Sequence, residues 1–551
     1  MSIRRLFGVA GVVVGMAAAP VPGAFSQVSV CEWAGSPCKL SVGLNDADVI
    51  DSEIAPNGQR VVLIHKHKET LRVELYSAPL TGGSPPVRLS VAGEHSRFVA
   101  ISPDSTRVLY TVPAGAGQPG DPLRNELFSV PIAGPASARV KLAADVSTGL
   151  RVRVSPDSAK VVFAPPERDR LRVAPIAGPA SAAERLTDPF AAGGKVGELA
   201  ISANSRSVVY RADQLTVGVN ELYRVPLTLS PAADPPTTRL NGPLVAGGDV
   251  YEFTLASDSS RAVYRADQDA DDVGELYSVR LGGAGRVKLN RTLPPEWNVG
   301  GPIEEQGEGD LPARILPDGS RVLYEIGYLD DISGRLFAEL YSVPIAGPGS
   351  ASVRLDDPSL IPSGWIHVRD YKLSANSSRV VYSMVNQSQG KIWLASVPAA
   401  GPASASQKLA GPTDSPPGYI YALSPDSGRV AYIPLSGQSD LSSVPIGGGT
   451  SVRLNGTDTP RAFLRINDTS TRAVYEARTL FGTPALFSVP LDGNGNRYNL
   501  TNSLNGTWYL RAYGVTPGSG TVVYTIHRGP LDAPAEAFSS RLTPAILPPI
   551  P

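Results

Sequence analysis

One pattern of apolar and polar positions recurs along the chain. An apolar residue precedes a short turn of Ser, Pro, Asp, Asn or Gly, and a mostly basic position then opens a β-branched run that closes with an aromatic. Such turns accept the positive φ of a tight hairpin, and a continuous apolar run is typical of a strand buried on both faces. The ten copies begin at Ile54, Ile101, Val154, Ile201, Leu255, Ile315, Leu373, Leu423, Ile466 and Val515.

Each copy predicts four strands. The segment before the turn is the first strand, and the β-branched run is the second. A third is expected at a recurring Glu-Leu-Tyr/Phe-Ser-Val-Pro element, such as residues 339–344, and a fourth at Val-Arg-Leu, such as residues 353–355. Copies lie 43 to 60 residues apart, which is the length of one propeller blade with variable loops. The predicted fold is all-β, a β-propeller of ten four-stranded blades.

The two ends of the repeat array complement each other. Residues 35–41 match residues 83–90 and predict a fourth strand that lacks its own first and second strands. The last copy has only three strands, so the N-terminal strand would complete it and remove exposed edges. This favours one closed ring of ten blades. Two smaller, five-bladed propellers remain the alternative, because the longest connection, residues 290–313, falls near the midpoint.

The turn followed by an aromatic, as in residues 101–110 and 315–324, resembles the repeat of the TolB-like (WD40-like) β-propeller family. The resemblance covers nearly the whole of residues 27–543 and implies the propeller fold. The chain departs from TolB in having more blades and no extra N-terminal domain. The resemblance therefore does not imply the TolB partnership with a peptidoglycan-associated lipoprotein.

Composition and the N-terminus bear on the location of the protein. Among 551 residues, 55 Gly and 51 Pro exclude long helices, and a net charge of −1 without a basic stripe argues against nucleic acid as partner. Arg4 and Arg5 precede an apolar run over residues 6–19, which predicts a signal peptide over residues 1–26. No later run is long enough to span a membrane. We expect a periplasmic or secreted protein with a Pro-rich C-terminal tail at residues 544–551.

The only two cysteines, Cys31 and Cys38, lie near the mature N-terminus. In an oxidising compartment their spacing is compatible with one disulfide across a hairpin. Two unpaired thiols are the alternative.

No local motif marks a catalytic centre. The chain has no Gly-x-Ser-x-Gly elbow, P-loop or dinucleotide fingerprint. His65 and His67 share one face of an extended segment and could hold a metal, although a solvated basic face beside Lys66 and Lys68 is the simpler interpretation. The repeated basic residue and the repeated Tyr occupy one register of the blades, so we interpret both as structural. We expect the basic residue to contact turn Asp residues or neighbouring carbonyls.

An acidic loop in the fifth copy is the candidate metal site. Asp267, Asp269, Asp271 and Glu275 place carboxylates at intervals that can converge on one hard cation. The segment is similar to a calcium loop of the Asp-x-Asp-x-Asp-Gly type, except that Asp272 replaces the Gly. It predicts a calcium site; a plain solvated acidic loop is the alternative. Nearby loops add Glu304, Glu305, Glu308, Asp310, Asp330 and Asp331.

These features predict a binding protein. Propeller function usually resides on the face with the variable loops, and here the loops vary most around the fifth and sixth copies. We expect an exported, non-catalytic scaffold that presents this face to a protein or a cell-envelope glycan. The alternative is a polysaccharide lyase or hydrolase with its site at the central channel, built from residues of different blades.

Overall fold

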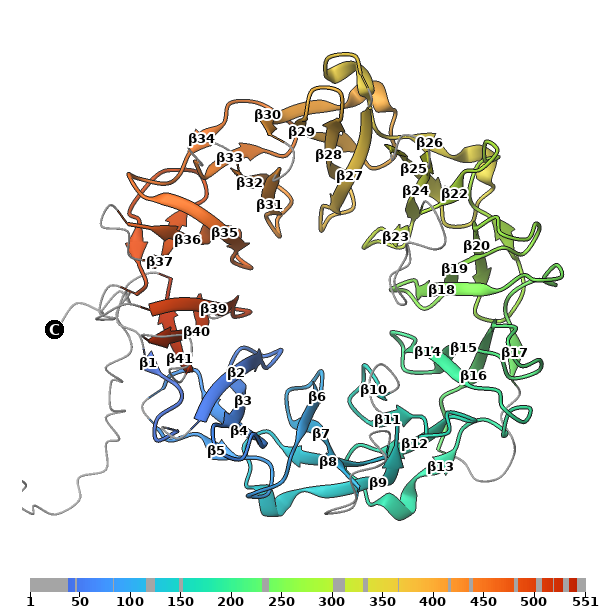
Figure 1. The fold of residues 1–551 in the computed structure, drawn as a ribbon, viewed down its shortest axis with the longest axis vertical. Helices are drawn as coiled ribbons and strands as arrows, with labels where there is room; N and C mark the ends of the chain where they lie inside the picture. Colours follow the sequence, from blue (N-terminus) through green and yellow to red (C-terminus); the bar gives the residue numbers. More distant parts are fainter. Residues whose placement is uncertain are drawn as a thin grey trace, which may run out of the picture.

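The structure is a computed structural model in which ten small β-sheets form one ring (Figure 1). In every sheet the neighbouring strands are antiparallel, and the first strand of the blade lies nearest the centre of the ring. The described residues are 38–44, 47–82, 84–114, 124–147, 152–229, 237–300, 313–330, 335–364, 366–414, 418–435, 440–479, 484–501, 508–518, 520–528 and 535–542.

The first five blades follow the predicted four-strand order. Blade 1 is β2 (Ala47–Ile54), β3 (Arg60–His67), β4 (Val73–Pro79) and β5 (Val87–Arg88). Blade 2 is β6 (Arg97–Ile101), β7 (Arg107–Pro113), β8 (Asn125–Pro131) and β9 (Val140–Val146). Blade 3 is β10 (Val152–Val154), β11 (Lys160–Phe163), β12 (Arg172–Pro175) and β13 (Glu184–Arg185). Blade 4 is β14 (Val196–Ile201), β15 (Ser207–Ala212), β16 (Glu221–Pro226) and β17 (Thr238–Arg239). Blade 5 is β18 (Val250–Leu255), β19 (Arg261–Ala266), β20 (Glu275–Arg280) and β21 (Val287–Lys288).

The remaining blades keep this order, with one variation. In blade 6 the first strand is split into β22 (Asn298–Val299) and β23 (Ala313–Ile315), followed by β24 (Arg321–Asp330), β25 (Arg335–Pro344) and β26 (Val353–Arg354). Blade 7 is β27 (Ile366–Leu373), β28 (Arg379–Asn386), β29 (Lys391–Pro398) and β30 (Gln407–Asp414). Blade 8 is β31 (Tyr419–Leu423), β32 (Arg429–Pro434), β33 (Ser442–Pro445) and β34 (Val452–Arg453). Blade 9 is β35 (Thr459–Ile466), β36 (Arg472–Arg478), β37 (Pro484–Pro490) and β38 (Tyr498–Asn499). Blade 10 is β39 (Trp508–Val515), β40 (Thr521–Arg528), β41 (Ala535–Arg541) and β1 (Cys38–Lys39).

The N-terminal strand closes the ring as the sequence predicts. Cys38 lies opposite Ser539 and Lys39 opposite Phe538, so β1 becomes the fourth strand of blade 10. The Lys39 Nζ atom also forms an ion pair with Glu536 at 2.5 Å. The edge of β41 is therefore paired rather than exposed.

The core is divided among the blade interfaces. Ten clusters of buried apolar side chains each join two adjacent blades, and one of them joins blade 10 to blade 1 through Leu40, Val61 and Val523. Blades 5 and 6 are joined by a cluster that includes Leu276 and Val322. The structure is thus a single ring, and the alternative of two smaller propellers is wrong.

The repeated basic residue is structural, as expected, and its main partner is a serine. Arg379 in β28 donates through Nε to the Ser396 hydroxyl at 2.8 Å and through Nη2 to the Ser396 carbonyl at 3.2 Å. In blade 4 the pair is reversed, since Arg224 donates to Ser207 at 3.0 Å. The same Nε-to-hydroxyl bond links Arg60 to Ser77, Arg107 to Ser129, Arg261 to Ser278, Arg321 to Ser342, Arg429 to Ser443 and Arg472 to Ser488.

The turns between first and second strands also connect the blades. In blade 3, Ser158 has a φ of 58° and accepts a hydrogen bond from the Asp104 amide of blade 2 at 3.0 Å. The corresponding serine of blade 4, Ser205, accepts from Asp157 at 2.9 Å. The turn serine thus adopts the positive φ of the hairpin and also contacts the preceding blade. Short 3₁₀ turns are the helices of the described part: Ala136–Ala138, Ala180–Ala182, Gly349–Ala351, Pro358–Leu360 and Ala403–Ala405. None of them approaches the length or apolar character that a membrane span requires.

Candidate functional site

The acidic loop between β19 and β20 is held by several different partners. Asp267 is buried, and its carboxylate accepts hydrogen bonds from the backbone amides of Asp249 and Asp272. Asp271 is exposed and lies against Gly247, where a Cβ atom would be 2.5 Å from the Asp271 carboxylate. Asp267 thus orders the loop from inside, whereas Asp271 lies on its surface.

The other two carboxylates of the predicted calcium site face a lysine. Lys288 Nζ lies 2.7 Å from Asp269 and 2.6 Å from Glu275. Although burial alone would lower the pKa of Lys288, its hydrogen bonds with Asp269 and Glu275 raise that pKa overall. The Tyr277 hydroxyl donates to Glu275 at 2.9 Å. The calcium site stays a prediction: across the described ranges, no three His, Cys, Asp or Glu side chains are gathered as metal ligands.

The Glu275–Lys288 pair belongs to the repeat. The recurring Glu of the third strand contacts a basic residue of the fourth strand in several blades, including Glu221 with Arg239 at 2.8 Å. The recurring Glu-Leu-Tyr and Val-Arg-Leu elements place one acidic and one basic residue in most repeats. The ion pair was not predicted from this pattern. The same contact pairs Lys39 with Glu536, Lys141 with Glu126, and Arg354 with Glu339.

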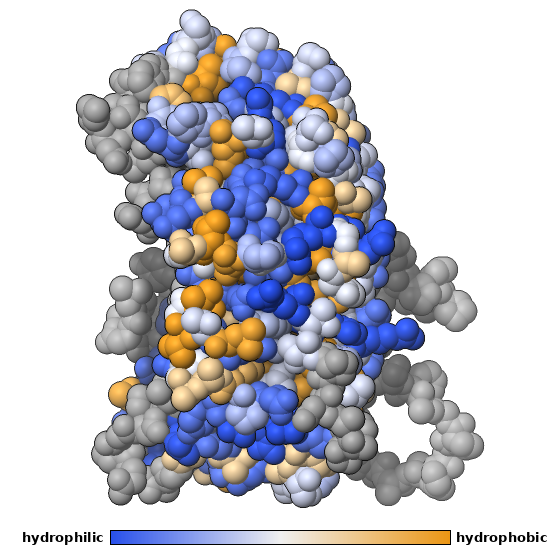
Figure 2. Space-filling view, turned by 90° about the vertical axis from the view of Figure 1, so that its right-hand side faces the viewer, coloured by the Kyte–Doolittle hydropathy of each residue, from blue (hydrophilic) through white to orange (hydrophobic). Residues whose placement is uncertain are grey.

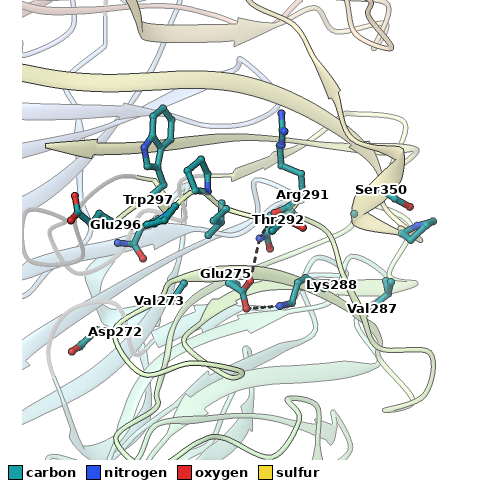
Figure 3. A pocket seen from close by; sticks show the side chains of 17 residues that line it. Asp272, Val273, Glu275, Val287, Lys288, Arg291, Thr292, Glu296, Trp297 and Ser350 are labelled. Carbon is teal, nitrogen blue, oxygen red and sulfur yellow. Dashed lines mark hydrogen bonds and ion pairs between the residues drawn. The ribbon is translucent and has the colours of Figure 1, made fainter. Parts of the chain in front are cut away.

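A cavity of about 830 Å³ lies above this ion pair, between blades 5 and 6 (Figure 3). One wall comes from β21 and from the connection over residues 290–298, and the other comes from residues 348–350 of blade 6. Gly349 permits this contact, because a Cβ atom there would collide with the Asn290 carbonyl. The volume is within the range of small-molecule binding sites. The sequence did not reveal the cavity, since its walls come from different repeats.

The polar groups of the cavity are of two kinds. Asn290 is fixed, since its Oδ1 accepts from the Leu276 amide at 2.8 Å and its Nδ2 donates to the Arg291 carbonyl at 2.9 Å. Arg291 is exposed, its Nη1 donates to the Tyr341 hydroxyl at 2.8 Å, and it forms no ion pair with a described carboxylate. The cavity therefore has a rigid floor in which Lys288 neutralises Glu275. The guanidinium of Arg291 shares the rest of the lining with the exposed carboxylates of Asp272 and Glu296.

Trp297 is the aromatic residue that lines the cavity, and other rings support it from behind. Trp297 is partly buried and lies 5.4 Å from the Tyr328 ring, and Tyr328 stacks on Phe337 at 4.8 Å. In Figure 3, Trp297 and Arg291 both point away from the Glu275–Lys288 pair. Figure 2 shows the adjoining rim of the ring, where hydrophilic and hydrophobic side chains are interspersed.

A second group of polar side chains lies on the first and second strands of blades 6 to 8. Glu325 in β24 is partly buried between blades 6 and 7, and this burial, together with the Asp370 carboxylate of β27, raises the pKa of Glu325 to about 7. The Tyr421 hydroxyl of β31 donates to Asp370 at 3.1 Å, and the Ser383 hydroxyl also donates to Asp370. These residues come from three consecutive blades and could not be associated from sequence.

The histidine pair differs from the sequence interpretation in one respect. His65 is buried rather than solvated, and its ring makes edge contacts with His67 at 5.3 Å and Tyr76 at 5.4 Å. His67 Nε2 lies 3.5 Å from Glu74. The His65 ring thus packs against the largely apolar ring of Tyr76 inside blade 1.

Several predictions lie outside the described residues. Cys38 is buried at the start of β1, but Cys31 is outside the described part, so their disulfide stays a prediction. The signal peptide over residues 1–26 and the tail over residues 544–551 are also outside it. So are residues 301–312 and Asp331, and no side chain is described for Asp330.

Comparison with known proteins leaves the family open. No family model matches the chain, and no curated protein matches its sequence. One similar solved structure is a eukaryotic initiation factor, with 12% identity over 76% of this chain and 91% of that chain and a TM-score of 0.47. Another is dipeptidyl peptidase 4 of Porphyromonas gingivalis, with 12% identity over 69% of this chain and 56% of that chain and a TM-score of 0.40. A third is an oligogalacturonate lyase in complex with manganese, with 10% identity over 80% of this chain and 96% of that chain and a TM-score of 0.34. Likeness this remote carries no argument about function, and membership of the TolB-like family stays an expectation.

Proposed function

We propose that the protein is a non-catalytic binding protein that holds a glycan in the cavity between blades 5 and 6. The observation that carries the proposal is the combination of a partly exposed Trp297 with fixed polar groups around one cavity. A sugar ring has an apolar C–H face that stacks on an aromatic ring and hydroxyls that hydrogen-bond at its edge. Pockets with aromatic walls and a few convergent polar groups suit such a ligand.

The environment expected for the protein supports the same partner. If residues 1–26 direct export, the mature protein meets cell-envelope or extracellular glycans. The cavity also lies in the region of blades 5 and 6 where the sequence predicted the functional loops. A rigid floor favours binding, because the polar groups are already ordered before the ligand arrives.

Trp297→Ala tests the proposal. Parent and variant are compared by calorimetry on a panel of neutral oligosaccharides. Loss of a stacking tryptophan should weaken binding at least about tenfold, which corresponds to ~1.4 kcal/mol. The matched control is Phe190→Ala, since Phe190 is also a partly buried ring, stacked on Tyr210 in the connection between blades 3 and 4. Equal binding by parent and Trp297→Ala, or no oligosaccharide bound by the parent, would contradict the proposal.

Cleavage of a polysaccharide at the centre of the ring is the second candidate function. It is favoured by the neighbouring carboxyls of Glu325 and Asp370, because a carboxyl with a pKa near 7 can donate a proton at neutral pH. This function predicts new reducing ends when the parent is incubated with polygalacturonate, and loss of that activity in Glu325→Gln. Absence of activity in the parent would leave binding as the function.

A further inference from the structure

Five cationic side chains lie on the inner strands of blades 6, 7 and 9, and all are exposed. Figure 1 shows that β23, β27 and β35 border the same side of the centre of the ring, with β31 between β27 and β35. We call these residues the basic arc. They are Arg314 of β23, Arg369 and Lys372 of β27, and Arg461 and Arg465 of β35.

The basic arc differs from the cations of the outer strands in that its members form no ion pair with a described carboxylate. Glu325, Asp370 and Glu476 lie nearby without direct contact: Arg314 opposes the rise in the pKa of Glu325, Arg461 opposes that of Glu476, and Asp370 opposes the fall in the pKa of Lys372. Outer-strand residues such as Arg239 and Lys288 form ion pairs with third-strand carboxylates at 2.6 to 2.8 Å. No member of the basic arc has a described carboxylate within ion-pair distance. Asp370, the nearest acid on β27, instead accepts hydrogen bonds from Tyr421 and Ser383.

Lys372 lies close enough to Arg314 and Arg465 for their charges to repel it. Burial lowers the pKa of Lys372, and the charges of Arg465 and Arg314 lower it further, although Asp370 opposes them. Aromatic and backbone contacts hold the cations in place. Lys372 Nζ donates to the Tyr421 carbonyl at 2.5 Å and lies 4.4 Å from the Tyr421 ring centre, and the Arg314 guanidinium lies 5.5 Å from the Tyr371 ring centre. A group of ordered, mutually repelling cations is stabilised by an anionic ligand.

We propose that the basic arc binds an extended acidic polysaccharide through its carboxylates. Arginine suits this ligand because its guanidinium pairs with a carboxylate through two parallel hydrogen bonds. The surface does not continue into blade 1, two blades beyond β35, where the inner strand β2 exposes Asp51 and Glu53. These carboxylates confine a polyanion to the arc, and the single-stranded DNA of the test distinguishes a nucleic acid from a polysaccharide. The surface is separate from the cavity between blades 5 and 6, so the proposal does not depend on the proposed function.

The test measures binding of polygalacturonate, with the neutral chain pullulan and a single-stranded DNA as comparison probes. The double variant Arg314→Gln/Arg465→Gln removes two charges from the arc. The matched control Arg206→Gln/Lys408→Gln removes two exposed charges elsewhere, from a turn of blade 4 and from β30. The single variant Arg465→Gln provides a milder change if the double variant melts early. All proteins are compared by melting curves before binding is measured.

We expect the parent to bind polygalacturonate but not pullulan through this surface, with an affinity that falls as salt rises. The arc double variant should bind at least about tenfold more weakly, Arg465→Gln should bind more weakly than the parent, and the control should match the parent. Trp297→Ala should leave this binding unchanged, which separates it from the cavity. Three results would overturn the proposal: no binding by the parent, equal loss in the control, or DNA bound as tightly as polygalacturonate.

Discussion

At the residue scale, equivalent positions in different blades hold residues of opposite charge or no charge. The position after the core tyrosine of the second strand is Arg265 in blade 5, where it pairs with Glu252 at 2.7 Å in a buried ion pair. It is Ser383 in blade 7 and Glu325 in blade 6. Sequence showed that the tyrosine is core, but it did not show the partners of the next residue. Arg265 and Ser383 each contact a carboxylate on the first strand of their own blade, 13 residues earlier in the chain. Glu325 instead lies near Asp370 of the next blade.

Glu325→Gln should change how stability depends on pH. Because the folded-state pKa of Glu325 is raised from 4.5 to about 7, folding favours its protonated form. The stabilisation is complete below pH 4.5 and is lost as the pH rises through 7. The unfolding free energy of Glu325→Gln minus that of the parent should therefore be ~1–2 kcal/mol more favourable to the variant at about pH 8 than at about pH 5. Denaturant unfolding at both pH values measures this gain, and a difference that does not change with pH would contradict it.

At the scale of elements, the strands could be predicted because each repeat carries its own local pattern. Apolar runs set the second strands, and Ser in the turns takes the positive φ. The partner of the repeated arginine was not identified, because the serine that accepts its hydrogen bonds stands on the third strand. The cavity was missed for a related reason, since Gly349 of blade 6 must meet Asn290 of blade 5 to form it.

In blade 4 the arginine stands on the third strand and the serine on the second, as Arg224 and Ser207. This suggests that Arg379 and Ser396 of blade 7 can be exchanged. Arg379→Ser alone should cost ~1–2 kcal/mol, because it removes two hydrogen bonds from a charged donor. Adding Ser396→Arg should restore at least half of that loss, since the donor and acceptor only exchange strands. A double-mutant cycle in denaturant provides the measurement. If the double variant is less stable than the sum of the single variants predicts, the pair is not interchangeable.

The acidic loop of blade 5 provides a further test. Lys288 neutralises Asp269 and Glu275, so calcium must compete with its ammonium group for these two carboxylates. We expect calcium at ten times its Kd to stabilise the parent by ~1.4 kcal/mol. At one fixed calcium concentration, Lys288→Gln should be stabilised more than the parent, because the competing ammonium group is gone. Melting curves with millimolar calcium and with chelator test both proteins, and Asp269→Ala is the control. If each of the three proteins melts identically with calcium and with chelator, the loop is a solvated acidic turn without a calcium site.

At the scale of the whole molecule, ring closure was predictable because residues 35–41 repeat the fourth strand of a blade. The single ring was decided only by the structure, which places a continuous apolar cluster between blades 5 and 6 and another between blades 10 and 1. The basic arc also exists only at this scale, since its five cations come from three separate blades.

Removal of the closing strand should open the ring. Deletion of residues 27–46 takes away β1 and its Lys39–Glu536 ion pair, and leaves β41 as an exposed edge. We expect a loss of several kcal/mol and aggregation on heating. Deletion of residues 544–551 is the control and should leave the melting temperature unchanged. A truncated protein that melts with the parent would show that closure does not depend on β1.

The central claim is that a glycan binds in the cavity between blades 5 and 6. Hydrogen–deuterium exchange of the parent tests it directly, measured with and without the tightest oligosaccharide of the binding panel. The account predicts slower exchange in residues 272–298 and 348–350, which form the floor and walls of the cavity. The blades opposite the cavity should exchange at the same rate in both states. Slowing that is confined to other blades, or a bound oligosaccharide that leaves residues 272–298 unprotected, would contradict the account.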